Sequence, residues 1–301
     1  MKGRLCLLLV LALPKISLAE APTFSKDIFP ILQEKCIQCH RPGEMGPMSL
    51  SSYQEVRPWA AAIREAVLTQ RMPPWYADAP RGFYSNDWRL SPEETDLMSR
   101  WVLARAPEGD PKDLPAPRQF TEGWRKGRPS LILRLPETVQ IPARGSDLYP
   151  TVVLDHEFAH DTWIRSLEIR PENRRVLHHG NVEVIIPNPG RTVDWAKLRE
   201  KGESKDEPTF STKLIHVGVP GRFSFDTPAS SAVLIPRGSR LRLNLHYVPS
   251  GRPETDRTAV GLYFAEGSID KERRNLHFQT KEIRIPPNTP NHVVHGAKEV
   301  T

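Results

Sequence analysis

The segment LRLNLHY, residues 241–247, alternates apolar and polar side chains along its whole length. A period of two is typical of a β-strand that buries one face. Seven other short runs, rich in β-branched, aromatic and aliphatic residues, are separated by turn-forming residues: 130–135, 151–154, 163–169, 181–186, 232–235, 260–264 and 282–285. Strands of this length and spacing predict an all-β antiparallel sandwich over residues 130–301.

Histidines occur at two notable places in this predicted sandwich. His246 lies near the end of the alternating run, and His178 and His179 form an adjacent pair upstream. Adjacent side chains of a regular strand point to opposite faces, so the pair can bind one ion only at a strand end or a bulge, which Gly180 allows. With His246 as a third imidazole, the residues would form an all-nitrogen site of the kind that copper accepts. The alternative is a set of half-buried strand histidines without a metal.

The remaining histidines of the sandwich fit strand edges or loops, and His216 is one of them. The segment HEFAH, from His156 to His160, matches the zinc-peptidase pattern, in which a helix places both imidazoles on one face with Glu157 as base. The runs on either side of it are strand-like. We therefore expect a turn at this place and no peptidase site.

Closer to the N-terminus, the segment CIQCH, residues 36–40, is the attachment pattern of a c-type haem. Two thiols about one helical turn apart can add to the two vinyl groups of a haem, and the adjacent imidazole can reach the iron. The motif predicts Cys36 and Cys39 as covalent haem attachments and His40 as an axial ligand. A redox-active Cys-x-x-Cys pair, or a disulfide, is the alternative.

The surroundings of this motif have helical patterns. Residues 24–35 and 51–70 place apolar side chains at helical spacing, and Ser91 predicts an N-cap whose capping box is closed by Glu94, for a helix that ends near residue 106. We predict a small all-α domain over residues 20–106, in the three-helix order of a minimal cytochrome c.

A methionine between the second and third of these helices is the expected sixth ligand of the iron. Met72 lies in the segment RMPPW, where two prolines stiffen the loop that would hold its thioether. Met45 and Met48 are the competing candidates, and Met98 fits the helix core. We expect Met72 to be the axial ligand.

The composition also marks targeting and linker segments. Residues 1–19 combine Lys2 and Arg4 with an apolar run and end in the small residue Ala19, which predicts a signal peptide and a periplasmic or secreted protein. Residues 107–129 are rich in proline and predict a linker. No later segment has the length of a transmembrane helix. Beyond residue 19 the formal charge falls from +6 to 39 − 36 = +3, which does not support nucleic-acid binding.

Two segments resemble a known family. The segments RSLEIRPENRRVLHH (165–179) and LNLHY (243–247) resemble the first copper domain of the type II, ascorbate-dependent copper monooxygenases, which include peptidylglycine α-hydroxylating monooxygenase. Residues 23–75 resemble the cytochrome c module that some bacterial members have ahead of their copper domains. The resemblance implies a jelly-roll-like sandwich in which His178, His179 and His246 bind the copper that stores and passes electrons.

The chain departs from that family at its C-terminal end. The family's second sandwich binds the hydroxylating copper through a His-x-His pair and a Met, but no Met follows Met98 here. His292 and His295 have His-x-x-His spacing and fit a tail. We therefore expect a truncated protein without the hydroxylating copper site, and its catalytic residues stay unassigned.

Two functions fit these observations. One is a haem c and copper redox protein of the monooxygenase type, in which the haem delivers electrons to the three-histidine copper. Its second copper domain is then missing here or supplied by another chain. The other is a haem c electron-transfer protein whose sandwich binds a partner or ligand without copper. Either function requires a protein or a small reductant as electron donor or acceptor.

Overall fold

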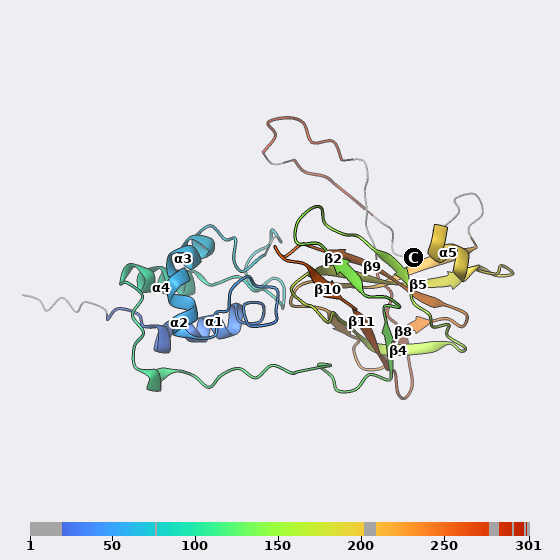
Figure 1. Ribbon diagram of the computed structural model, residues 1–301, viewed down its shortest axis with the longest axis horizontal. Helices are drawn as coiled ribbons and strands as arrows, with labels where there is room; N and C mark the ends of the chain where they lie inside the picture. The colour runs from blue at the N-terminus through green and yellow to red at the C-terminus, as the bar shows by residue number, and fades with distance from the viewer. Residues whose placement is uncertain are drawn as a thin grey trace, which may run out of the picture. The chain divides into compact units, whose positions relative to one another are not determined.

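The computed structural model describes residues 20–75, 77–201, 209–276, 283–290, 292–297 and 299. The chain forms two compact units, shown in Figure 1. The first combines the residues up to Arg41 with Met48–Arg118, and the second combines Pro42–Pro47 with Gln119–Thr301. Among the described residues, no helix is long and apolar enough to cross a membrane.

The described part of the first unit contains helices and no strand. Its elements are η1 (Phe24–Ile28), α1 (Phe29–Lys35), α2 (Tyr53–Val56), η2 (Arg57–Trp59), α3 (Ala60–Leu68), α4 (Pro92–Leu103) and η3 (Pro111–Asp113). The predicted helix over 24–35 is present, with a π-helical first turn. The one predicted over 51–70 is divided into three pieces, because Pro58 has no amide hydrogen to continue the helical ladder.

Helix α4 begins as the sequence predicts. The Ser91 hydroxyl accepts a hydrogen bond from the Glu94 amide at 3.1 Å, and the Glu94 carboxylate accepts one from the Ser91 amide at 2.7 Å. This reciprocal pair is the expected capping box, and it is confirmed. The helix ends at Leu103, earlier than predicted, because Arg105 and Ala106 have φ values of 65° and 52°, which no α-helix accommodates.

The second unit contains two large sheets. A six-stranded sheet has the order β1-β11-β4-β8-β12, with β7 also paired to β4, and a four-stranded sheet has the order β3-β9-β5-β6. Strands β10 and β2 form a small third sheet. All pairings are antiparallel except that of β12 with β8. The strands are β1 (Leu131–Arg134), β2 (Val139–Ile141), β3 (Thr151–Val153), β4 (Thr162–Arg170), β5 (Leu177–Pro187), β6 (Phe210–Gly218), β7 (Ser224–Asp226), β8 (Ser231–Ile235), β9 (Arg240–Tyr247), β10 (Glu254–Asp256), β11 (Ala259–Phe264) and β12 (Lys271–Glu272).

A single apolar core joins the two large sheets. Leu167 and Ile169 from β4 and Leu262 from β11 belong to the same buried cluster as Val182 from β5 and Leu243 from β9. On β9 the alternate residues Leu241, Leu243 and Leu245 are buried, as the period of two predicts. The two sheets and their shared core confirm the antiparallel β-sandwich expected from the sequence. Helix α5 (Trp195–Lys201) belongs to the same unit.

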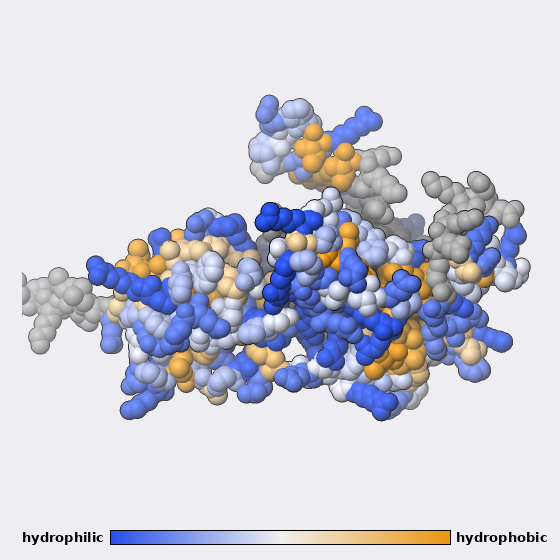
Figure 2. Space-filling view, in the orientation of Figure 1, coloured by the Kyte–Doolittle hydropathy of each residue, from blue (hydrophilic) through white to orange (hydrophobic). Residues whose placement is uncertain are grey.

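One predicted strand is wrong. Glu282 lies outside the described residues, and residues 283–285 have no strand conformation. Ile283 and Ile285 are 52% and 64% exposed, so this segment has no sheet to cover its apolar side chains. Figure 2 shows hydrophobic residues exposed on the projecting C-terminal segment. The sequence prediction also missed β2, β6, β7, β10 and β12, whose patterns are short or mixed in polarity.

The proline-rich segment over residues 107–129 makes hydrogen bonds within both units. The carbonyl of Pro107 accepts from the Phe24 amide at 2.9 Å, and the Arg118 amide donates to the Gln33 side chain at 2.7 Å. Farther along, the Arg125 amide donates to the Glu168 carboxylate at 2.9 Å, and a Cβ on Gly261 would lie 2.7 Å from the Trp124 ring. The segment therefore divides between the two units at Arg118 and Gln119.

A buried polar network anchors the end of β9. The Asp256 carboxylate, 1% exposed, accepts hydrogen bonds from the Tyr247 hydroxyl at 2.7 Å, the Thr258 hydroxyl at 2.6 Å and the Asn173 amide at 2.9 Å. Burial, followed by the Asp256 charge, raises the pKa of Tyr247, so its hydroxyl keeps the proton that it donates. The network ties Tyr247 to the loop before β5.

Replacing Tyr247 by Phe should destabilise the second unit. The change leaves a buried carboxylate with one donor fewer, which costs about 1–3 kcal/mol of unfolding free energy. Urea unfolding monitored by tryptophan fluorescence measures it. Tyr263→Phe is the control, because the Tyr263 hydroxyl donates to the uncharged carbonyl of Gly127. An equal or larger loss for the control would contradict the importance of the carboxylate.

Candidate metal centre

A β-bulge brings the adjacent histidines to one site. Strands β5 and β9 pair Leu177 with Tyr247 and His179 with His246, and the register shifts between these two pairs. His178 is the additional residue that the bulge inserts. The sequence prediction that the pair needs a strand end or a bulge is therefore confirmed.

Gly180 lies directly after the bulge, at a position with little room for a side chain. Its φ is not in the left-handed region, but a Cβ at this position would lie 3.0 Å from Cδ2 of Leu245 and 3.6 Å from Cδ1 of Ile169. The missing side chain leaves room for the core side chains of Leu245 and Ile169. The structure thus shows close packing at Gly180, and the expectation that its backbone freedom allows the bulge stays a prediction.

The three imidazoles converge. Each of His178, His179 and His246 offers a ligand atom, and these atoms lie within 4.8 Å of one another. Nδ1 of His178 is 3.2 Å from Nδ1 of His246. Two nitrogens bound at about 2.0–2.1 Å to one ion, at an angle near 100°, lie about 3.1 Å apart, so this pair fits a metal ion.

Burial and the neighbouring imidazoles favour the neutral form of His179. Desolvation, followed by the neighbouring imidazoles of His246 and His178, lowers the pKa of His179. Its Nδ1 is buried and has no hydrogen-bond partner. A neutral imidazole keeps a lone pair for a metal ion, and the buried nitrogen marks a polar group that the protein itself leaves unsatisfied.

His246 has two neighbours that the sequence analysis missed. Its Nε2 is 2.7 Å from Oδ2 of Asp147, and its ring stacks on Tyr149 with centroids 4.4 Å apart and an interplanar angle of 17°. Both residues lie in the segment before β3, about a hundred positions earlier in the chain. Only the alternation of Asp147, Leu148 and Tyr149 hinted at an extended segment, and nothing in the sequence reveals its partner.

The cysteine motif lies at the end of α1 in the first unit. The amides of Cys39 and His40 donate to the Cys36 carbonyl at 3.1 and 3.0 Å, which forms a helix-like turn after Lys35. Both cysteines are thiols and not a disulfide. Burial raises the pKa of the Cys36 thiol to about 12, with a smaller contribution from Cys39.

His40 is oriented by a backbone carbonyl. Its Nδ1 is 3.2 Å from the carbonyl oxygen of Met48. A carbonyl can only accept, so Nδ1 bears the hydrogen and Nε2 keeps the lone pair that an iron ligand needs. Burial lowers the pKa of His40 and so favours the neutral ring. These residues fit a covalently attached haem.

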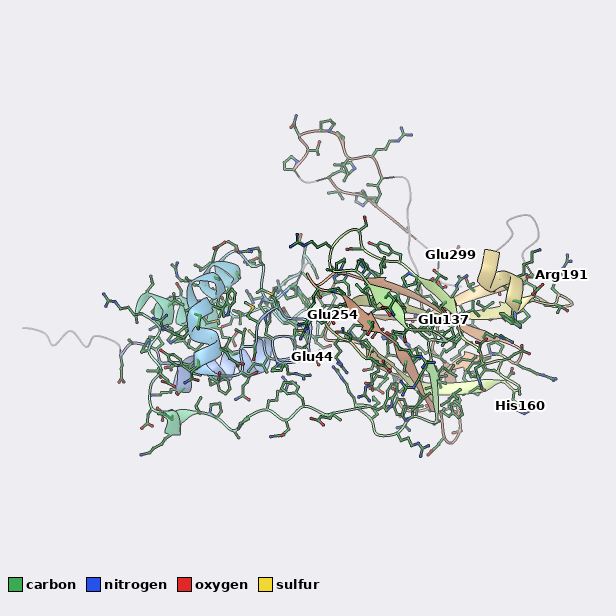
Figure 3. All side chains as sticks on the ribbon, viewed as in Figure 1. Glu44, Glu137, His160, Arg191, Glu254 and Glu299 are labelled. Atoms are coloured by element: carbon green, nitrogen blue, oxygen red, sulfur yellow. The ribbon has the colours of Figure 1, made fainter. Side chains whose placement is uncertain are left out.

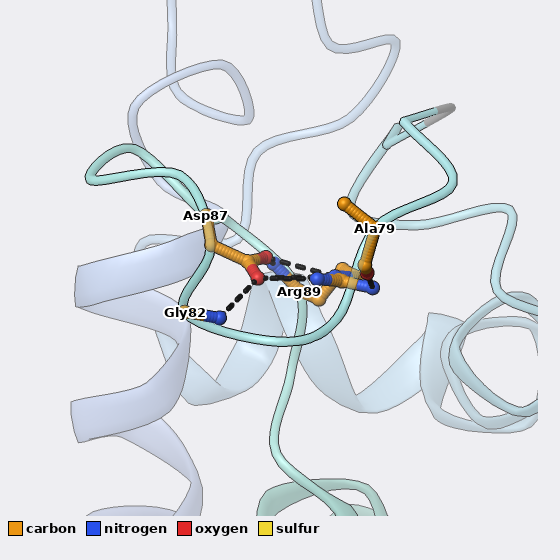
Figure 4. A network of polar contacts seen from close by, with 4 residues as sticks. All are labelled: Ala79, Gly82, Asp87 and Arg89. Carbon is orange, nitrogen blue, oxygen red and sulfur yellow. Dashed lines mark hydrogen bonds and ion pairs between the residues drawn. The ribbon is translucent and has the colours of Figure 1, made fainter.

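Arg89 hydrogen-bonds to two residues of the loop between α3 and α4, in which Met72 also lies (Figure 4). Arg89 donates to the Asp87 carboxylate through Nε at 2.9 Å and Nη2 at 2.5 Å, and to the Ala79 carbonyl through Nη1 at 3.0 Å. Its guanidinium lies 5.7 Å from the centre of the Trp75 ring. This hydrogen bonding holds the pKa of Asp87 well below its usual range.

The four methionines beyond residue 19 differ in exposure. Met72 is 42% exposed, and Met45 and Met48 are half-buried. Met98 is 1% exposed, which confirms its place in the helix core. The assignment of Met72 as sixth ligand stays a prediction.

The other described histidines of the second unit do not belong to the three-histidine group. Residues 156–160 are not helical, so HEFAH does not place two imidazoles on one helix face, as expected. His160 is exposed at the edge of the sandwich (Figure 3). His292 and His295 are exposed in the C-terminal segment. Among the described residues, the group of His178, His179 and His246 is the only set of three or more potential ligands close enough to hold one ion.

Comparisons with protein families and with curated proteins were made for the whole chain. No protein-family profile matches the chain, and no curated protein matches it. The assignment of the site therefore depends on its residues and their geometry.

His216 predicts a pH dependence of stability. It is 5% exposed, and burial, followed by the Arg273 charge, lowers its pKa to about 4. In the unfolded chain the imidazole titrates near 6.5, so below that pH the unfolded state binds a proton that the folded state does not. The second unit should be most stable above pH 6.5 and lose about 3 kcal/mol as the pH falls to 4.

Urea unfolding between pH 7.5 and 4 on the wild type and His216→Gln measures this contribution. The variant should show a smaller loss of stability over that range, and His160→Gln should behave as the wild type does. An identical pH dependence in all three proteins would show that His216 is not the group responsible.

Proposed function

We propose that this chain is an exported haem c and copper redox protein, in which the haem supplies electrons to a copper ion bound by His178, His179 and His246. The observation on which this proposal depends is the convergence of the three imidazoles at the bulge of β5. Three neutral nitrogen ligands suit copper and leave room for a further ligand.

The haem half of the proposal has independent support. A haem bound to Cys36 and Cys39 supplies one-electron chemistry. The chain's own contribution is orientation: the Met48 carbonyl fixes the hydrogen of His40 on Nδ1, and the turn after α1 places the cysteines together. A helical unit around such a motif is consistent with a cytochrome c-like domain.

In the copper half of the proposal, the sandwich binds the ion that stores the electron. A copper ion at this site would supply one-electron storage. The imidazoles would hold it where β5 begins and β9 ends, on the two central strands of the four-stranded sheet, and the exposed His178 side chain would let an electron enter and leave. Resemblance to the first copper domain of the copper monooxygenases supports this role. We propose a jelly-roll-like sandwich on the basis of this resemblance, and a periplasmic or secreted location on the basis of the predicted signal peptide over residues 1–19.

The alternative function rests on the composition of the chain. No Met follows Met98, so this sequence offers no thioether for a hydroxylating copper. A haem c electron-transfer protein whose sandwich only binds a partner would need none. Hydroxylation by the oxidoreductase would instead need a thioether-containing copper site that the given residues do not supply.

Copper content distinguishes the two functions. Full-length protein matured in the periplasm with haem-assembly machinery and added copper should contain one iron and one type 2 copper per chain, by elemental analysis and electron paramagnetic resonance. His178→Ala should lose the stoichiometric copper and keep the haem. His160→Ala, which changes an exposed histidine outside the group, is the matched control and should keep both metals. Iron without copper in the wild type would refute the copper proposal and favour the alternative.

Replacing Met72 tests the haem ligation. A thioether favours ferrous iron, so Met72→Ala should lower the haem potential by a sizeable part of the roughly 0.8 V range that axial ligands set, and should remove the thioether signature from the spectrum. A redox titration followed by visible absorption measures both. Met45→Ala is the control. An unchanged spectrum for Met72→Ala would move the assignment to Met45 or Met48.

A further inference from the structure

The two flanking contacts of His246 come from one short segment. Leu148 and Tyr247 exchange backbone hydrogen bonds of 3.0 and 2.9 Å, so residues 147–149 run antiparallel to the end of β9. This register places Tyr149 opposite His246, where the two rings stack at 4.4 Å. Asp147, two residues earlier, reaches the Nε2 atom of the same ring.

The Asp147 contact determines which nitrogen of His246 bears the hydrogen. A carboxylate oxygen 2.7 Å from Nε2 accepts a hydrogen bond, so Nε2 is the donor and Nδ1 keeps the lone pair. Nδ1 is the atom that faces Nδ1 of His178 at 3.2 Å. The contact therefore directs the free lone pair of His246 toward the converging nitrogens.

Stacking on Tyr149 restrains the remaining freedom of the ring. A tilt of the His246 ring would lose the stack on Tyr149, and a 180° flip of the ring would lose the hydrogen bond to Asp147. The side chain of His246 is 11% exposed, whereas that of Asp147 is 37% exposed, so the carboxylate connects a buried ring to the surface.

We propose that Asp147 is the positioning residue of the three-histidine site: it selects the Nε2–H tautomer of His246 and so prepares Nδ1 to bind a metal ion. The inference rests on the proposed copper function of the same site. Hydrogen bonds of this kind orient metal-binding imidazoles and raise their basicity, and their loss typically weakens metal affinity about 10–100-fold.

The tautomer can be measured without any copper. We would record ¹⁵N-imidazole spectra of the copper-free full-length protein, using His246→Gln to assign the His246 signals. The wild type should show His246 with its hydrogen on Nε2, and Asp147→Ala should show a mixture of both tautomers. A tautomer unchanged in Asp147→Ala would overturn the inference.

Copper titration with a competing chelator provides the second readout. Asp147→Ala should bind Cu(II) about 10–100-fold more weakly than the wild type, with altered copper hyperfine splitting. Asp147→Asn, whose amide oxygen can still accept, should restore the tautomer and part of the affinity. The control is Asp270→Asn, which changes an exposed carboxylate directly before β12. It should bind copper as the wild type does.

The outcomes separate this inference from the proposed function. A wild type that binds no copper overturns the copper function. Copper bound to the wild type, with unchanged affinity in Asp147→Ala, overturns only the role of Asp147. Equal losses in Asp147→Ala and Asp270→Asn would also overturn it, because they would reflect a general effect of charge.

Discussion

The pairing of β5 with β9 is the interaction on which the site depends. In a regular antiparallel ladder, His178 and His179 would face opposite sides of the sheet. The bulge between Leu177 and His179 adds one residue to β5 and turns both imidazoles toward His246. Next to the bulge, Gly180 packs closely against Leu245, and the Tyr247 hydroxyl donates to the buried Asp256 carboxylate.

Two adjacent residues of β9, His246 and Tyr247, belong to the candidate site and to the core respectively. Tyr247 points into the core and bonds a buried carboxylate, whereas His246, one residue earlier, points to the opposite face and into the histidine group. Because side chains alternate between the two faces of a strand, adjacent residues serve the core and the histidine group. A change that loosens the core at Tyr247 would also displace the ligand next to it.

Both proposed redox sites prepare an imidazole in the same way. The Met48 carbonyl holds the hydrogen of His40 on Nδ1, and the Asp147 carboxylate holds that of His246 on Nε2. In each ring the opposite nitrogen keeps its lone pair. The two acceptors differ in charge, and this difference matters chemically, because a carboxylate makes the imidazole a stronger donor to a metal than a neutral carbonyl does.

The sequence by itself determined the period of two in β9, the capping box of α4 and the requirement for a bulge at His178 and His179, because each of these depends on residues close together in the chain. It also indicated the residues of the haem motif through their spacing. Only the tertiary structure decided that Asp147 and Tyr149 flank His246, since the register between segments about a hundred residues apart leaves no local pattern. For the same reason the strand expected over 282–285 was wrong. Its apolar residues predicted a strand, but residues 283–285 pair with none of the described strands.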